Sequence, residues 1–200
     1  MAISAKQIKE LRDITSSGFL DCRTALENSD GDFDKAVEFL RKKGLATATK
    51  RAGRDASEGI VELYDHGNGR VGVMVEVNCE TDFVARSESF RKFAHEIALQ
   101  VAASAPRWLK DEHIPEDVLQ KERDIARDRA LQEGKPEKIV DRIVDGRVDK
   151  FKEENTLMLQ AYIRDDSLSI QDYLHATISA IGENIVIRRF IRWEVGEKSK

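Results

Sequence analysis

The chain has 200 residues, with 33 Lys and Arg against 37 Asp and Glu, and a formal net charge of −4 at pH 7. A composition of 40% hydrophobic and 35% charged residues is typical of a globular protein with a heavily charged surface. No apolar run approaches the roughly 18–20 residues that span a bilayer. We therefore expect a cytoplasmic protein without a membrane partner. Cys22 and Cys79 lack the CxxC spacing and the companion histidines of a zinc site, so we expect two packed thiols and no metal.

The first 44 residues predict a miniature bundle of three short helices. Ser4 and Gln7 have the spacing of a capping box at the start of the first helix. Turn-forming residues at 15–18 and 28–31 separate the three apolar stripes. Asp32 or its neighbour can cap the third helix, and Gly44 is expected to end it. The stripes contain Ile8, Leu11 and Ile14, then Phe19, Cys22, Ala25 and Leu26, then Phe33, Ala36, Val37 and Leu40.

Residues 45–57 are predicted to form a basic linker. No acidic residue interrupts the basic side chains between positions 41 and 54, which are Arg41, Lys42, Lys43, Lys50, Arg51 and Arg54. Such a cluster can neutralise phosphates of a nucleic acid, or it can simply keep a connector solvated. The acidic net charge and the absence of an aromatic residue for base stacking favour the solvated connector, so we expect no direct contact with nucleic acid.

Residues 58–200 predict an α+β domain, in which a small antiparallel sheet is covered on one face by helices. Apolar residues alternate with period two in Val71–Cys79, which indicates a half-buried strand. A strand at 60–64, joined by turn residues at 66–69, would form a hairpin with it, and a third strand is expected at 185–195. Helices are expected after four capping or helix-initiating residues, which are Ser87, Pro115, Pro136 and Ser169.

The residues between Val71–Cys79 and the following helix should form a short connection held by rigid elements on both sides. Phe83 is bulky and apolar there, and it follows the carboxylate of Asp82. A phenylalanine at such a position either folds back into the core of its own chain or enters another protein.

No catalytic constellation stands out in the sequence. The chain has no GxxxxGK[ST] phosphate loop, and its four histidines are scattered. Glu80 and Asp82 are two residues apart, so paired-carboxylate catalysis is conceivable, but no third polar group or glycine-rich pocket accompanies them. We therefore expect a protein that is not an enzyme, with no catalytic residues and no cofactor.

Four collinear motifs give the chain a family resemblance over nearly its whole length. The run from Asn78 to Ala85 resembles the signature of elongation factor Ts, in the short bacterial form of that family. The other matches are Lys9–Arg12 with Thr15, Gly18, Asp21–Cys22, Ala25–Leu26, Gly31–Asp32 and Ala36, then Gly134–Pro136 with Gly146–Arg147, then Ile191–Gly196.

The resemblance implies a guanine-nucleotide exchange factor for elongation factor Tu. In the family, a bundle of the ubiquitin-associated type docks on the nucleotide-binding domain of that partner, and the segment after the strand presses in beside the magnesium site so that GDP leaves. Residues matching the contact positions are Arg12, Phe19 and Leu20 in the bundle and Thr81, Asp82, Phe83, Val84 and Ala85 after the strand. Phe19 and Leu20 stand where a methionine pair is common, which keeps the apolar character of the contact.

The resemblance also bears on assembly and leaves other classes open. Many family members carry two related subdomains where residues 58–200 have room for one, and short members compensate by homodimerising, so a homodimer is expected here. A ubiquitin-associated module with another adaptor role would account for residues 1–44 only. A ribosome- or RNA-binding protein would instead use residues 41–54.

Overall fold

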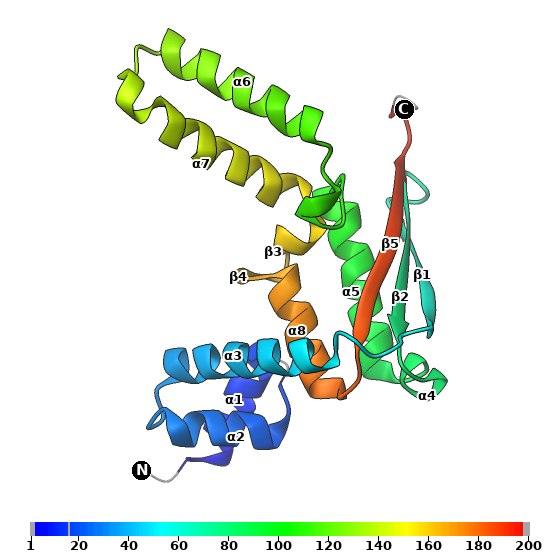
Figure 1. Cartoon of the computed structure of the whole chain (residues 1–200). Helices are drawn as coiled ribbons and strands as arrows, with labels where there is room; N and C mark the ends of the chain where they lie inside the picture. The colour runs from blue at the N-terminus through cyan, green and yellow to red at the C-terminus, as the bar shows by residue number, and fades with distance from the viewer. Residues whose placement is uncertain (1–2, 16, 198–200) are drawn as a thin grey trace. The chain divides into compact units, whose positions relative to one another are not determined.

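The computed structural model describes residues 3–15 and 17–197, and its elements confirm the expected α+β class (Figure 1). The chain divides into two compact units, one made of residues 1–99 with 171–200 and the other of residues 100–170. The expected division at 1–44, 45–57 and 58–200 stays a prediction. Within the described residues, no helix combines the length and the apolar character that crossing a membrane requires.

The N-terminal bundle consists of α1 (Ala5–Thr15), α2 (Phe19–Asn28) and α3 (Phe33–Arg51). The capping box is confirmed, because the Ser4 amide donates to Gln7 Oε1 at 3.0 Å and the Gln7 amide donates to Ser4 Oγ at 3.2 Å. Asp32 caps α3 through a 3.1 Å bond from the Lys35 amide. The bundle core contains Ile8, Leu11, Cys22, Ala25, Leu26, Ala36 and Leu40.

The prediction that Gly44 ends the third helix is wrong, because α3 continues to Arg51. The helix buries a stripe with a spacing of four residues, namely Ala36, Leu40, Gly44 and Ala48. A Cβ atom at position 44 would lie 3.4 Å from the carbonyl oxygen of His175 in α8 (Ile170–Ile181). The glycine therefore lets two helices approach closely, and the first residues of the expected linker are helical.

Three strands form the antiparallel sheet in the order β1-β2-β5, with β1 at Glu58–His66, β2 at Val71–Cys79 and β5 at Ile185–Glu194. The five residues of the period-two pattern, from Val71 to Cys79, are all buried on one face. Helix α5 (Glu88–Ser104) covers that face, where His95 Nδ1 lies 2.9 Å from Glu62 Oε1 (Figure 1). Its N-terminus is capped by Ser87, whose hydroxyl accepts from the Phe90 amide at 3.3 Å.

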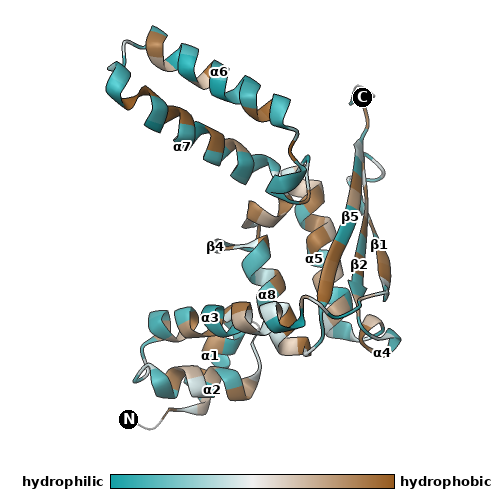
Figure 2. Ribbon diagram, in the orientation of Figure 1, coloured by the Kyte–Doolittle hydropathy of each residue, from teal (hydrophilic) through white to brown (hydrophobic). Residues whose placement is uncertain are grey.

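The second unit is built around an antiparallel helix pair, α6 (Glu116–Gln132) and α7 (Glu137–Asn155). Brown and teal segments alternate along both helices in Figure 2, as expected of helices with one apolar side. Their shared core contains Ile114, Leu119, Ala126, Ala130, Val140, Val144 and Val148. The unit also holds the short helices η1 (Asp111–His113) and η2 (Leu157–Leu159) and the two-stranded sheet of β3 (Ala161–Tyr162) and β4 (Asp165–Ser169).

Candidate partner-binding surfaces

The segment after β2 forms a single helical turn, α4 (Asp82–Ala85), where a plain connection was expected. Thr81 is the reason, because its extended backbone and its side-chain oxygen cap the turn by accepting from the Val84 amide at 3.3 Å. Asp82 occupies the first turn, where a carboxylate suits the helix dipole, and pairs with Arg86 at 2.8 Å.

The turn presents its aromatic side chain to solvent. Phe83 is 81% exposed, so it does not fold back into the core of its own chain. Thr81 and Asp82 are also exposed, Val84 is half-buried, and Ala85 is buried. The small side chain of Ala85 therefore anchors the turn while the residues before it face outward.

The backbone at Thr81 is fixed by a carboxylate more than a hundred residues away in sequence. Glu183 Oε2 accepts from the amides of Glu80 and Thr81 at 3.0 and 3.1 Å, and Glu183 Oε1 accepts from Thr81 Oγ1 at 2.7 Å. The Thr81 carbonyl oxygen in turn accepts from Cys79 Sγ at 3.2 Å. Burial, followed by the charge of Glu183, raises the pKa of Cys79 to about 11, so this thiol keeps the proton that it donates.

Glu80 and Asp82 use their carboxylates in different ways. Glu80 Oε1 accepts from the Asn184 amide at 2.6 Å, and Arg54 lies 3.4 Å from Glu80 Oε2. These two partners, the amide first, lower the pKa of Glu80. Asp82 pairs instead with Arg86. The two carboxylates therefore have separate partners, and the geometry gives no support to a shared acid–base pair.

The candidate docking residues of the bundle lie on its surface. Phe19 is 49% exposed and Leu20 is 71% exposed at the start of α2, so both adjacent apolar side chains meet solvent. Arg12 is exposed in the last turn of α1. Exposed apolar side chains such as these two are what a protein partner can bury.

Several basic residues of segment 41–54 bind groups of their own chain. Lys42 pairs with Glu38 at 2.7 Å, and Lys43 pairs with Asp21 at 2.6 Å. Arg51 donates to the carbonyl oxygen of Gly182. Because these cations already neutralise or bind groups nearby, the structure gives no particular support to a phosphate-binding role for the segment.

The uncovered face of the sheet is a surface that the sequence reasoning did not identify. Leu63 of β1 lies opposite Met74 of β2, which lies opposite Ile191 of β5, and all three are exposed. Val61 and Trp193 extend the same face and are exposed as well. We call these five residues the open sheet face. The period-two pattern that buries one face of β2 could have indicated it, because Met74 is apolar on the opposite side.

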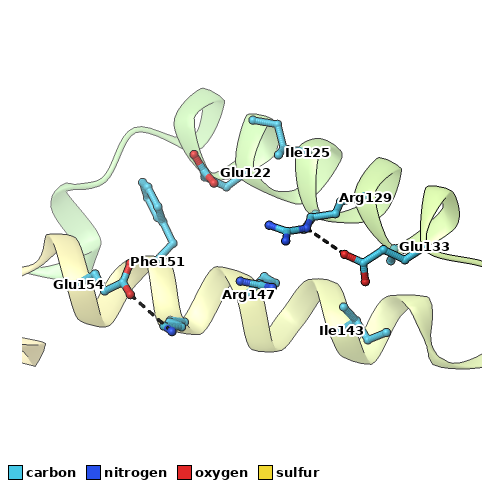
Figure 3. Close-up of a pocket in the computed structure, with 11 residues that line it drawn as sticks. Glu122, Ile125, Arg129, Glu133, Ile143, Arg147, Phe151 and Glu154 are labelled. Carbon is cyan, nitrogen blue, oxygen red and sulfur yellow. Dashed lines mark hydrogen bonds and ion pairs between the residues drawn. The ribbon is translucent and has the colours of Figure 1, made fainter. Parts of the chain in front are cut away.

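A cavity of about 230 Å³ lies between α6 and α7 in the second unit (Figure 3). Its walls mix Ile125, Ile143 and Phe151 with charged side chains, including the ion pair of Arg129 and Glu133 at 3.0 Å. A second ion pair in the walls joins Lys150 to Glu154 at 3.7 Å. In residues 3–15 and 17–197, no three His, Cys, Asp or Glu side chains are placed to hold a metal ion.

Comparison with known proteins shows which family the chain belongs to. The model of the family described as "Elongation factor TS" matches residues 46–197. Elongation factor Ts of Moorella thermoacetica is 54% identical over 98% of this chain and 96% of its own length. The chain belongs to the elongation factor Ts family. Elongation factor Ts of Caldanaerobacter subterraneus is 55% identical over 98% of both chains, and that of Coprothermobacter proteolyticus is 50% identical over 98% of this chain and all of its own length.

Family membership confirms the resemblance drawn from the motifs and makes the chain a translation elongation factor. The matched region begins in α3 and contains the sheet, the Phe83 turn and the whole second unit. The three elongation factor Ts relatives also cover the bundle, since they match 98% of the chain.

Proposed function

We propose that this chain promotes GDP release from elongation factor Tu. In this mechanism Arg12, Phe19 and Leu20 dock the bundle on the nucleotide-binding domain, and the turn with Asp82 and Phe83 inserts near the magnesium site. The observation that carries the proposal is that Phe83 is 81% exposed in a turn where the amides of Thr81 and Val84, on either side of it, are held by hydrogen bonds. A rigid, exposed aromatic side chain is the usual form of an interface anchor.

The physical basis of the mechanism is linkage between two binding equilibria. A protein that binds nucleotide-free elongation factor Tu more tightly than the GDP-bound form must weaken GDP binding by the same factor. Burying one phenylalanine supplies about 1.5–3 kcal/mol, or roughly 10- to 150-fold in an equilibrium constant. The remaining effect would come from the disturbed magnesium contacts in elongation factor Tu. The exchange factor needs no catalytic site of its own for this.

The release of a fluorescent GDP analogue from elongation factor Tu tests the proposal. The rate should rise with the concentration of this protein and then saturate. A rate that does not change at any concentration would refute the proposed function.

Docking by the bundle is tested with a substitution, because a truncation after residue 44 would cut through α3. We expect Leu20→Asp to raise the concentration needed for half-maximal exchange by about tenfold or more, since a carboxylate would be buried against the partner. Leu45→Asp is the matched control, because Leu45 is 52% exposed on α3 of the same bundle. Equal effects of the two substitutions would contradict docking through Leu20.

The open sheet face supports a homodimer as the form of the protein in solution. Contiguous exposed apolar side chains on three neighbouring strands are uncommon on a monomer. A second copy of the same face would cover them in a two-fold arrangement, in which each residue contributes twice.

A further inference from the structure

The turn between α8 and β5 carries a carboxylate that holds the base of the Phe83 turn. Glu183 accepts three hydrogen bonds, from the Glu80 amide, the Thr81 amide and the Thr81 hydroxyl, at 3.0, 3.1 and 2.7 Å. Hydrogen bonds to an ionised carboxylate are about twice as strong as those between neutral groups. One side chain therefore fixes the backbone directly before α4.

A second carboxylate, that of Glu80, joins the end of β2 to the turn before β5 from the other side. Glu80 accepts from the Asn184 amide at 2.6 Å, and Asn184 Nδ2 donates to the carbonyl oxygen of Arg54 at 2.8 Å. The end of β2 and the turn before β5 thus each offer a carboxylate to the backbone of the other. This cross-brace consists of Arg54, Glu80, Thr81, Glu183 and Asn184.

The cross-brace also orients the hydroxyl group that caps α4. Thr81 Oγ1 donates its proton to Glu183, which leaves its lone pairs for the Val84 amide at 3.3 Å. A helix of four residues cannot sustain itself, because nucleation costs more than one turn returns. The conformation of Asp82 and Phe83 therefore depends on contacts made outside α4.

We propose that Glu183 is a positioning residue for nucleotide exchange, which orders the Phe83 turn before the partner is met. This inference rests on the proposed function. Glu183 acts through Thr81, so its role is to raise the fraction of molecules in which Phe83 is ready to insert. When only a fraction of a protein is competent to bind, its apparent affinity falls by that fraction, whereas the saturated complex is unchanged.

The test separates apparent affinity from maximal rate in the full-length protein. Glu183→Ala should raise the half-saturating concentration for release of the fluorescent GDP analogue by about tenfold, with the maximal rate nearly unchanged. Hydrogen exchange at the Thr81 and Val84 amides should accelerate, while the amide of Val75 in the buried sheet stays protected and shows that the variant is folded. Glu183→Gln keeps one acceptor oxygen, so its shift should be smaller.

Glu194→Ala is the matched control, because Glu194 pairs with Arg192 on β5 and takes no part in the cross-brace. A half-saturating concentration that Glu183→Ala leaves unchanged, while Phe83→Ala slows exchange, would overturn the positioning role and leave the proposed function intact. A lowered maximal rate with protected Thr81 and Val84 amides would overturn the positioning role as well. If Phe83→Ala itself left exchange unchanged, insertion of Phe83 would be refuted, and the role of Glu183 with it, although GDP release would still be promoted.

Discussion

Phe83 is an exposed aromatic residue in a turn whose flanking backbone is held by hydrogen bonds. The residue is 81% exposed, whereas the nearby Ala85 is buried and Thr81 is bonded through its amide and its hydroxyl. Exposure of this kind contributes little to folding, because the ring gains no burial in the free protein. The favourable free energy of removing the ring from water is gained only when another protein covers it.

We therefore expect Phe83→Ala to separate folding from exchange. The free energy of unfolding should change by less than about 0.5 kcal/mol, while binding to elongation factor Tu should weaken by about 2 kcal/mol or more. Denaturant unfolding and the GDP-release assay measure the two quantities. Leu131→Ala, at another exposed apolar side chain, should change neither. A loss of roughly 3–5 kcal/mol in unfolding free energy would instead mark Phe83 as a core residue.

At the scale of the elements, two helix glycines affect the stability of the protein in opposite ways, because their surroundings differ. A Cβ atom at Gly44 of α3 would lie 3.4–3.6 Å from the backbone of α8, whereas nothing lies within 4 Å of one at Gly146 of α7. Glycine in an open helix lowers stability because the unfolded chain has more freedom to lose. At Gly44 a Cβ atom would already be in van der Waals contact with α8, so a larger side chain would have no room.

Gly146→Ala should raise the free energy of unfolding by about 0.5–1 kcal/mol. Gly44→Leu should lower it by about 1–3 kcal/mol or more, because the added side chain has no room against α8. Denaturant unfolding followed by circular dichroism measures both changes. Stabilisation by both substitutions would mean that α3 and α8 do not approach as closely as the structure has them.

Local patterns in the sequence predicted the elements whose cause is local. Ser4 with Gln7, Asp32 and Ser87 could be assigned as caps because each bonds within three residues. The meaning of Gly44 could not be predicted, because its reason lies on α8, which is far away in the sequence.

The residues of the candidate site also divide into those that a local pattern reveals and those that depend on distant contacts. The exposed residues around Phe83 could be singled out from one contiguous motif. Glu183 could not, because its bonds to Glu80 and Thr81 cross more than a hundred residues. A carboxylate alone in a turn gives no signal of the backbone amides that it will meet in the fold.

For the whole molecule, the open sheet face is the feature that bears on assembly. Leu63, Met74 and Ile191 lie side by side across the three strands and are exposed. In a symmetric dimer each copy would bury its own row of these side chains, so the apolar area of both copies would be removed from water. We expect the dimer to persist at micromolar concentration.

Met74→Lys should convert the dimer to a monomer, because a two-fold contact would place two ammonium groups in one apolar interface. Ile139→Lys is the matched control, since Ile139 on α7 is 43% exposed and Met74 is 44% exposed. Sedimentation or light scattering gives the mass of each variant. A mass of about 22.7 kDa for the unsubstituted chain over a wide concentration range would refute the dimer.

The surroundings of the two cysteines have a practical consequence for labelling. Cys22 and Cys79 are both buried, and burial raises the pKa of each thiol, so neither offers a thiolate to an alkylating dye at neutral pH. A cysteine introduced on the surface would therefore react selectively in the otherwise native chain. A fluorophore carried at position 139 on α7 could follow this protein through a translating extract without any change to the buried thiols or to the residues around Phe83.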